Sequence, residues 1–224
     1  MICSICSQIA GDPTHDLIAR TIASKMYVRR VVMETQNFAA FPSLGPLVPG
    51  HVIVCPKTHT RSFAALSSHH DVEFDEVVGT LRRMLGQLYE APVHLFEHGM
   101  AGEGSRILCS VDHGHLHLVP ARVSVRAALE TYPRIVVGNG LGGLREAVSS
   151  EEYIFYEGPD RIRHVIRSQD HQFESQFLRQ IFARALGHTS EWNWREHLKP
   201  EETQETYKTL VNAFSQEVHA CPDS

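Results

Sequence analysis

The segment 110–120, SVDHGHLHLVP, contains three alternating histidines: His113, His115 and His117. Side chains of a strand point alternately to its two faces, so the three imidazoles would share one face, and Leu116 and Leu118 would point into the core. With 15 histidines in 224 residues, this spacing arises by chance with a probability of about 0.07. The spacing therefore indicates a chemical site without proving one.

Three interpretations fit the triad taken alone. The histidines could form a solvated patch on an edge strand. A metal held by all three is disfavoured, because the first and third would lie about 13 Å apart and each imidazole reaches roughly 5–6 Å from its Cβ. In the third interpretation the histidines have different roles: one neutral imidazole attacks a substrate phosphorus, while its neighbours bind phosphate oxygens or a metal.

A second pair of candidate residues is Cys3 and Cys6, in the sequence CSIC. A Cys-x-x-Cys pair arises in this composition about 0.1 times by chance. The two cysteines could be small buried residues, a redox pair, or half of a zinc site completed by two histidines. A redox pair would normally follow a strand in a βαβ unit, and none is expected here. The segment HVIVCPKTH offers His51 and His59 as the missing ligands.

In this order and spacing, CSIC, PGHVIVCPKTH and SVDHGHLHLVP resemble the histidine triad (HIT) family of nucleotide hydrolases and transferases, over roughly residues 1–120. The resemblance implies that His115 attacks the α-phosphorus of a nucleotide and forms a nucleotidyl-histidine, which is passed to water or another acceptor. It implies that His117 contacts the phosphate oxygens and that Ser110 touches the phosphate or the leaving group. The chain looks most similar to diadenosine-tetraphosphate-hydrolase-like members with a C-terminal extension.

The resemblance to zinc-bearing relatives also implies a ligand set: Cys3, Cys6, His59 and His113. A Cys₂His₂ site has no open position, so this zinc would be structural. It would clamp the N-terminus to the first histidine of the triad and thereby fix the segment that carries His115.

The resemblance places further residues at the substrate site. We expect substrate contacts from His51, Ser43, Phe41 and Gln176, although His51 could instead hydrogen-bond the catalytic segment or simply pack. Cys109, Glu97 and Ser43 depart from the residues that many relatives carry. A carboxylate at position 97 would repel a bound phosphate unless it points away or pairs with a cation.

Adenosine polyphosphates, such as dinucleoside tetraphosphates, and nucleoside phosphoramidates are the substrates that the resemblance implies. The three departures keep open a nucleotide-binding sensor, or a zinc-stabilised interaction protein, with little turnover. A biosynthetic transferase would share the intermediate and differ in the acceptor. The resemblance also implies a homodimer formed by pairing of sheets.

The composition suits a globular protein with a sizeable core, because 42% of the residues are hydrophobic and 21% are charged. A net charge of −5 without a long basic run argues against a general nucleic-acid binder. The N-terminus lacks the pattern of a secretory signal, and no apolar run is long enough for a membrane span. Five cysteines without such a signal favour a reducing compartment, so we expect a cytoplasmic protein.

The catalytic residues must be positioned by an α+β fold with an antiparallel sheet and a packed helix. Apolar positions at helical spacing predict a helix over 71–89, with Asp71 as its N-cap. Strands are predicted over the ranges 30–41, 51–56 and 92–98 and in the histidine segment.

Beyond residue 145, the sequence predicts a hairpin followed by helices over 172–187 and 200–218. We therefore expect a catalytic domain over 1–145 and an extension over 146–224 packed on it, similar to one found on some bacterial relatives. GNGLGG (138–143) reads as a flexible connection rather than a ligand loop. In the extension, Gln176, Arg179 and Arg195 could meet substrate phosphates, whereas a Phe-rich helix and scattered arginines more often only pack or face solvent.

Overall fold

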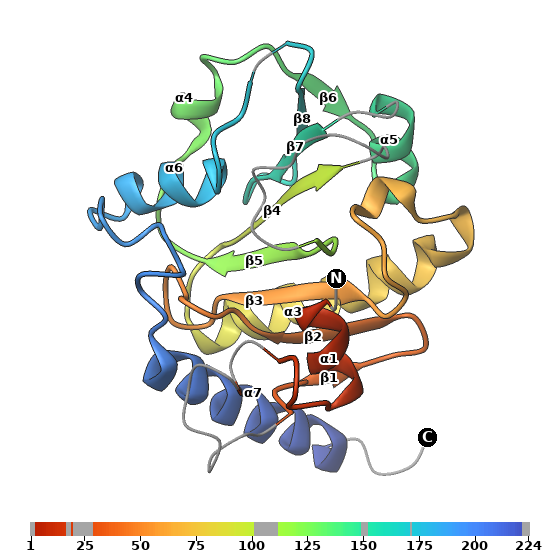
Figure 1. The fold of residues 1–224 in the computed structure, drawn as a ribbon, viewed down its shortest axis with the longest axis vertical. Helices are drawn as coiled ribbons and strands as arrows, with labels where there is room; N and C mark the ends of the chain where they lie inside the picture. The colour runs from red at the N-terminus through yellow and green to blue at the C-terminus, as the bar shows by residue number, and fades with distance from the viewer. Residues whose placement is uncertain are drawn as a thin grey trace.

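A single antiparallel sheet organises the chain (Figure 1). The computed structural model describes residues 3–16, 19, 29–100, 112–148, 152–170 and 172–220. The strands are β1 (Met33–Glu34), β2 (Phe38–Pro42), β3 (Val52–Pro56), β4 (Val93–Met100), β5 (Leu116–Pro120), β6 (Ile135–Val137), β7 (Glu152–Glu157) and β8 (Arg163–Arg167). Their order is β1-β2-β3-β5-β4-β7-β8-β6, and every neighbouring pair is antiparallel. The predicted α+β class is confirmed.

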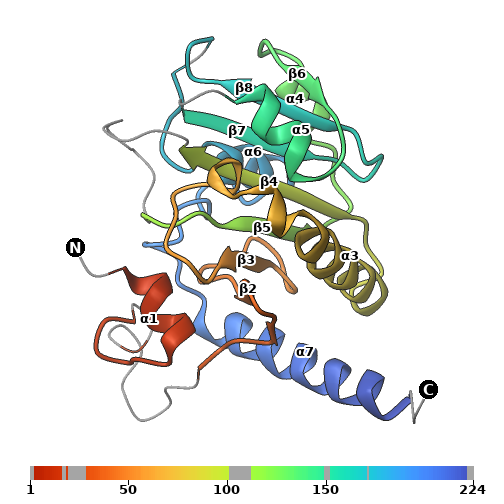
Figure 2. The same cartoon turned by 90° about the vertical axis from the view of Figure 1, so that its right-hand side faces the viewer.

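Helices cover both faces of this sheet (Figure 2). They are α1 (Ser4–Ala10), α3 (Asp71–Leu88), α4 (Arg126–Leu129), α5 (Gly140–Ala147), α6 (Phe177–Ala185) and α7 (Pro200–Ala220), with two short 3-10 helices at Phe63–Ala65 and Ser68–His70. The helices expected near 71–89 and 200–218 are therefore confirmed. Among the described residues, no helix is both long and apolar enough to cross a bilayer.

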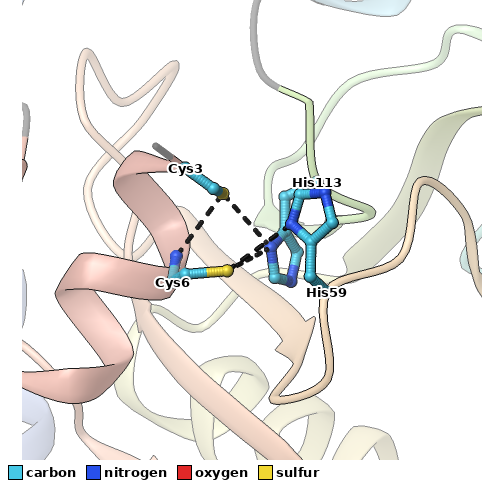
Figure 3. Close-up of side chains that lie close together, drawn as sticks. All are labelled: Cys3, Cys6, His59 and His113. Atoms are coloured by element: carbon cyan, nitrogen blue, oxygen red, sulfur yellow. Dashed lines mark hydrogen bonds between the residues drawn. The ribbon is translucent and has the colours of Figure 1, made fainter. Parts of the chain in front are cut away.

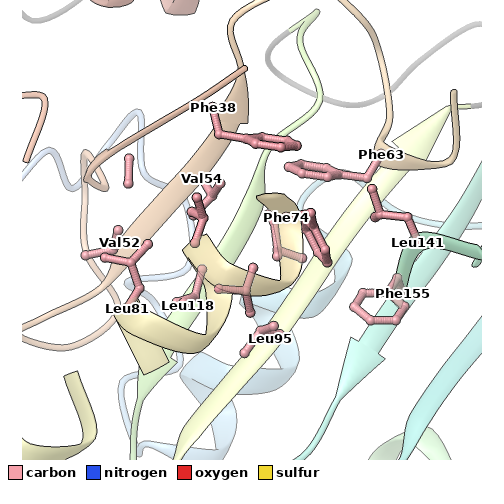
Figure 4. Close-up of a cluster of buried hydrophobic side chains, with 14 of the residues drawn as sticks. Phe38, Val52, Val54, Phe63, Phe74, Leu81, Leu95, Leu118, Leu141 and Phe155 are labelled. Carbon is pink, nitrogen blue, oxygen red and sulfur yellow. The ribbon is translucent and has the colours of Figure 1, made fainter. Parts of the chain in front are cut away.

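Helix α3 packs one face of the sheet through the apolar positions that its periodicity predicts. Phe74 and Leu81 lie on this face against strand residues such as Val52 and Leu118 (Figure 4). Leu81 is fully buried, which contributes on the order of 1.5–3 kcal/mol to folding. His70 is the N-cap and Asp71 the first helical residue, so the expected N-cap is wrong by one position; the Asp71 carboxylate forms an ion pair with Arg145 at 2.5 Å.

The alternation along β4 separates two cores. Leu95 belongs to the core under α3, whereas Phe96 belongs to the core under α6. Glu97 points to the α3 side, where it is fully buried and accepts hydrogen bonds from the Tyr153 hydroxyl at 2.5 Å and the Phe63 amide at 2.9 Å. Burial raises the pKa of this carboxyl to about 7. A ligand on the α6 side of the sheet therefore does not face the Glu97 carboxylate.

The C-terminal part of the chain shares the same sheet. Strand β4 pairs with β5 on one side and with β7 on the other, in register from Leu95–Glu157 to Met100–Glu152. The predicted hairpin is present as β7 and β8. The division at residue 145 stays a prediction, and β7 and β8 belong to the sheet that carries the histidines.

Three further local expectations differ from the structure. The range 30–41 forms a hairpin, β1 and β2, because Glu73 accepts hydrogen bonds from the backbone amide and side chain of Asn37 at the bend. The glycine-rich range 138–143 leads into helix α5 rather than a flexible connection. The leucines of α5, Leu141 and Leu144, are buried in the core, and their packing overrides the low helix propensity of glycine. Helix α6 is shorter than the predicted 172–187.

Candidate functional site

Two cysteines and two histidines from distant parts of the chain meet beside α1 (Figure 3). Cys3 precedes the helix, Cys6 lies in it, His59 follows β3, and His113 precedes β5. One donor atom from each of the four residues lies within 4.8 Å of the others. Sulfur and Nδ1 are 3.4 Å apart between Cys3 and His113, and 3.5 Å apart between Cys6 and each histidine.

These separations fit a tetrahedral zinc ion. Zn–S bonds of ~2.3 Å and Zn–N bonds of ~2.0–2.1 Å place sulfur and nitrogen donors about 3.6 Å apart. The His113 Nε2–H donates to the Pro56 carbonyl at 2.8 Å, which leaves the Nδ1 lone pair directed at the cysteines. Burial, followed by the nearby Cys3 sulfur, raises the pKa of Cys6 to about 12, so two thiolates side by side require a cation.

A short turn separates His113 from the rest of the triad. Strand β5 begins at Leu116, so the expectation of three histidines on one strand face is wrong. The cause is Gly114, whose amide donates to the Thr60 carbonyl at 2.6 Å and whose Cβ position lies only 2.9 Å from the Ser62 nitrogen. This close approach lets His113 face the cysteines while the next two histidines face a pocket.

His115 is fixed in one tautomer. Its Nδ1 lies 2.7 Å from the His113 carbonyl oxygen, which can only accept, so Nδ1 carries the proton and Nε2 carries the lone pair. Burial lowers the pKa of His115 despite this hydrogen bond, so the ring is neutral at neutral pH. A neutral imidazole with a free lone pair is a competent nucleophile.

His117 is fixed by a chain of hydrogen bonds that starts at a backbone amide. The Leu47 N–H donates to His51 Nδ1 at 3.1 Å, so the proton of His51 sits on Nε2. That Nε2–H donates to His117 Nδ1 at 2.8 Å, which leaves the His117 proton on Nε2. Burial lowers the pKa values of both rings well below their ordinary range. His117 is therefore a neutral hydrogen-bond donor.

Both His115 and His117 line one pocket. Its walls from the N-terminal half combine apolar residues with polar and charged ones: Ile5, Phe41, Leu44, Ile53 and Phe96 with Gln8, Asp16 and Arg30. The C-terminal segment supplies the opposite wall: Gln176, Phe177, Leu178, Arg179 and Trp194. The pocket is thus shared between the segment that carries the histidines and residues 176–194.

The remaining candidates are placed as follows. Ser43, Phe41 and Gln176 line the pocket; the Ser43 hydroxyl donates to the Leu44 carbonyl at 3.2 Å. The Gln176 amide is oriented by Asn193 at 3.1 Å and by the Trp194 amide at 3.3 Å. His51 is fully buried behind His117 and does not line the pocket. Ser110, like Cys109, lies outside the described residues.

Sequence reasoning missed two neighbours of the triad on β4. The Phe96 ring stacks on His117, with centroids 4.4 Å apart. His98 lines the pocket, and its Nε2 lies 2.6 Å from a Glu152 carboxylate oxygen in β7. The alternation of VHLFEHG places Phe96 and His98 on one strand face, and this signal could have found both.

Part of the chain matches a known family model. Residues 25–124 match the family model described as "HIT domain". No curated protein matches the chain.

Solved structures with similarity to this chain come from several organisms. A member of the HIT family of proteins from Bacillus subtilis is 23% identical, with 54% of this chain and 73% of that chain covered and a TM-score of 0.41. A Zn-bound histidine triad family protein from Mycobacterium smegmatis is 24% identical over 54% and 75%, with a TM-score of 0.39. A histidine triad nucleotide-binding protein from Candida albicans is 22% identical over 53% and 74%, with a TM-score of 0.38.

Proposed function

We propose, from the match of residues 25–124 to the HIT domain model, that this chain is a nucleotide hydrolase or nucleotidyl transferase acting on the α-phosphate. The intermediate is a nucleotidyl-histidine on His115. One observation carries the proposal: His115 and His117 line the same pocket. The Nε2 atom of His115 carries a lone pair, and the Nε2 atom of His117 carries a proton.

The reaction takes two displacements at phosphorus. In the first, the His115 Nε2 lone pair forms a bond to phosphorus while the bond to the leaving group breaks. The leaving group departs with the electron pair of the broken bond and takes up a proton from water. In the second, water or an acceptor hydroxyl attacks phosphorus and loses its proton, and the His115 nitrogen recovers its lone pair. The His117 Nε2–H donates to a non-bridging oxygen and stabilises the charge that develops there.

Cys3, Cys6, His59 and His113 hold a zinc ion in this proposal. Bound by four protein ligands, the ion has no open position and braces the structure instead of activating a substrate. The fit of the sulfur–nitrogen separations to tetrahedral zinc supports this assignment. His113 is joined to His115 through a single glycine and through its own carbonyl, so its placement sets the direction of the nucleophile.

The pocket suits a nucleotide. Phe41 and Ile53 offer apolar surface for a base, and Ser43 and Gln176 lie where polar contacts to the sugar or phosphates can form. We propose adenosine polyphosphates, such as dinucleoside tetraphosphates, or nucleoside phosphoramidates as substrates. The chain then functions as a diadenosine-tetraphosphate-hydrolase-like enzyme of the cytoplasm, with the extension 146–224 forming one wall of its site.

A homodimer is part of this proposal. Strands β4 and β5 lie inside the sheet, so a partner that joins by strand pairing would meet β1 or β6, its outer strands among the described residues. Light scattering after gel filtration tests it, and a monomer at all concentrations would contradict it.

The test of the function uses a dinucleoside tetraphosphate and an adenosine phosphoramidate, each labelled at the α-phosphate. We expect turnover of at least one substrate and its loss in His115→Ala. The matched control is His69→Ala, an exposed histidine away from the pocket, which should turn over normally. Tight binding of the nucleotide without turnover would instead indicate a sensor. Full turnover by His115→Ala would exclude the proposed mechanism.

A further inference from the structure

Arg179 of α6 is a buried cation that the reaction scheme does not use. Its side chain is 4% exposed, although arginine is rarely buried without a charged partner. Its Nε donates to the Trp192 carbonyl at 2.9 Å and its Nη2 to the Gly45 carbonyl at 2.6 Å. Both partners are uncharged. Within the part of the chain that the structure describes, Nη1 makes no hydrogen bond.

Among the residues that the structure describes, no ion pair compensates the charge of this guanidinium. Burial lowers the pKa of Arg179 to about 9, and no acidic side chain of the described residues offsets the shift. The group is still a cation at neutral pH. Burying an unpaired charge costs several kcal/mol, so proteins place such a group where a counter-ion or an anionic ligand meets it.

The location of Arg179 identifies where that anion would lie. Arg179 lines the same pocket as His115 and His117. Its positive charge also contributes to the lowered pKa values of His51, His115 and His117, so its field reaches all three rings. The cation, the nucleophile and the N–H donor therefore converge on one pocket.

We propose that Arg179 binds the negative charge of the phosphoryl group that His115 attacks, through Nη1, so that the extension contributes a phosphate-binding residue to the HIT domain. This inference rests on the proposed function for the identity of the phosphoryl group. Guanidinium groups match phosphate oxygens in geometry and charge. The ligand class is a phosphate monoanion or dianion attached to a nucleoside.

A purely structural role makes a different prediction. Arg179 also ties the loop at Gly45 to the segment that contains Trp192. If that were its whole role, replacing it would lower stability and leave the affinity of the folded protein for anions unchanged. Anion affinity therefore separates the two roles.

The experiment is calorimetric titration of the full chain with inorganic phosphate, AMP and adenosine. In Arg179→Gln we expect the affinities for phosphate and AMP to fall about tenfold or more, because a hydrogen bond to a charged group is lost. Arg179→Lys keeps the charge and should lose less. Adenosine affinity should not change. Unchanged phosphate and AMP affinities in folded Arg179→Gln would overturn the proposal.

Two controls keep the test decisive. Arg184→Gln removes an exposed cation from the same helix and should bind phosphate like the unmodified chain. If Arg179→Gln does not fold, the melting temperature of the unmodified chain and of Arg179→Lys is compared in phosphate and in chloride at equal ionic strength. Phosphate should raise the melting temperature of both proteins, and should raise it more for the unmodified chain than for Arg179→Lys. An unmodified chain whose melting temperature does not rise in phosphate would overturn the inference.

The outcome can be told apart from failure of the proposed function. His115→Ala should abolish turnover while phosphate still binds at Arg179. Phosphate binding that depends on Arg179, in a chain with no turnover, would contradict the proposed function and support the anion site. Turnover with an intermediate on His115, together with unchanged phosphate affinity in Arg179→Gln, would support the proposed function and contradict the role of Arg179.

Discussion

His51 Nε2 lies 2.8 Å from His117 Nδ1, and this contact determines which nitrogen of His117 faces the pocket. The Leu47 N–H donates to the other nitrogen of His51, so His51 must donate to His117 and cannot accept from it. A residue outside the pocket thus sets the protonation pattern of one that lines it.

His51→Ala tests this relationship. Without the donor, His117 can place its proton on either nitrogen, so the N–H directed at the phosphate is no longer assured. We expect kcat to fall about tenfold to a hundredfold, because one buried hydrogen bond is lost. Nitrogen NMR shifts of the His117 ring should report the change of tautomer. An unchanged tautomer would remove the role that we assign to His51.

Zinc removal is the second prediction. Cys6→Ser and His59→Ala should lower the metal content measured by plasma mass spectrometry from about one zinc per chain, and should lower both the melting temperature and kcat. The reason is that, in the proposed zinc site, the ion would fix His113, whose carbonyl accepts a hydrogen bond from His115 Nδ1. His69→Ala serves again as the control. Metal-free variants with full activity and stability would show that the four donors do not brace the site.

The buried carboxyl of Glu97 gives the third prediction. Its pKa is raised from 4.5 to about 7 in the folded state, so folding favours the protonated form. The protonated Glu97 carboxyl therefore makes its full contribution to the free energy of unfolding below pH 4.5. This contribution is lost as the pH rises towards 7, by up to about 1.4 kcal/mol per pH unit. Glu97→Gln should remove this part of the slope in urea unfolding measured at several pH values. The same slope in both proteins would contradict it.

Gly45 supports the fourth prediction. Its φ is +57°, and a Cβ there would lie 2.6 Å from the His197 carbonyl oxygen and 2.7 Å from the Trp194 Cβ. Gly45→Ala should therefore destabilise the docking of the C-terminal segment by about 1–3 kcal/mol. Gly79→Ala is the matched control, because no atom of the described residues lies within 4 Å of its Cβ position on the exposed face of α3. Limited proteolysis of the 188–198 segment should be faster in Gly45→Ala alone.

The sequence predicted the features that depend on local patterns. The periodicity of Phe74 and Leu81 located α3, and the resemblance assembled Cys3, Cys6 and the two histidines that the structure brings within 4.8 Å of one another. These features need only spacing along the chain or a known arrangement of donors.

The rest depends on contacts between distant segments. Nothing local to Arg179 shows that it will be buried beside His115 rather than solvated on the helix surface. The pairing of β7 with β4 likewise could not be read from either strand, because both carry ordinary strand patterns. The break before Leu116 arises from the approach of Gly114 to Ser62, which no alternation of histidines and leucines reveals.

The central claim is the covalent bond between His115 and phosphorus. Rapid acid-free quenching during turnover of a dinucleoside tetraphosphate, followed by peptide mass spectrometry, tests it most directly. The account predicts one added nucleotidyl mass on the peptide that contains His115, which acid removes and which is absent in His115→Ala. Turnover with no such adduct, or with the adduct on another residue, would contradict it.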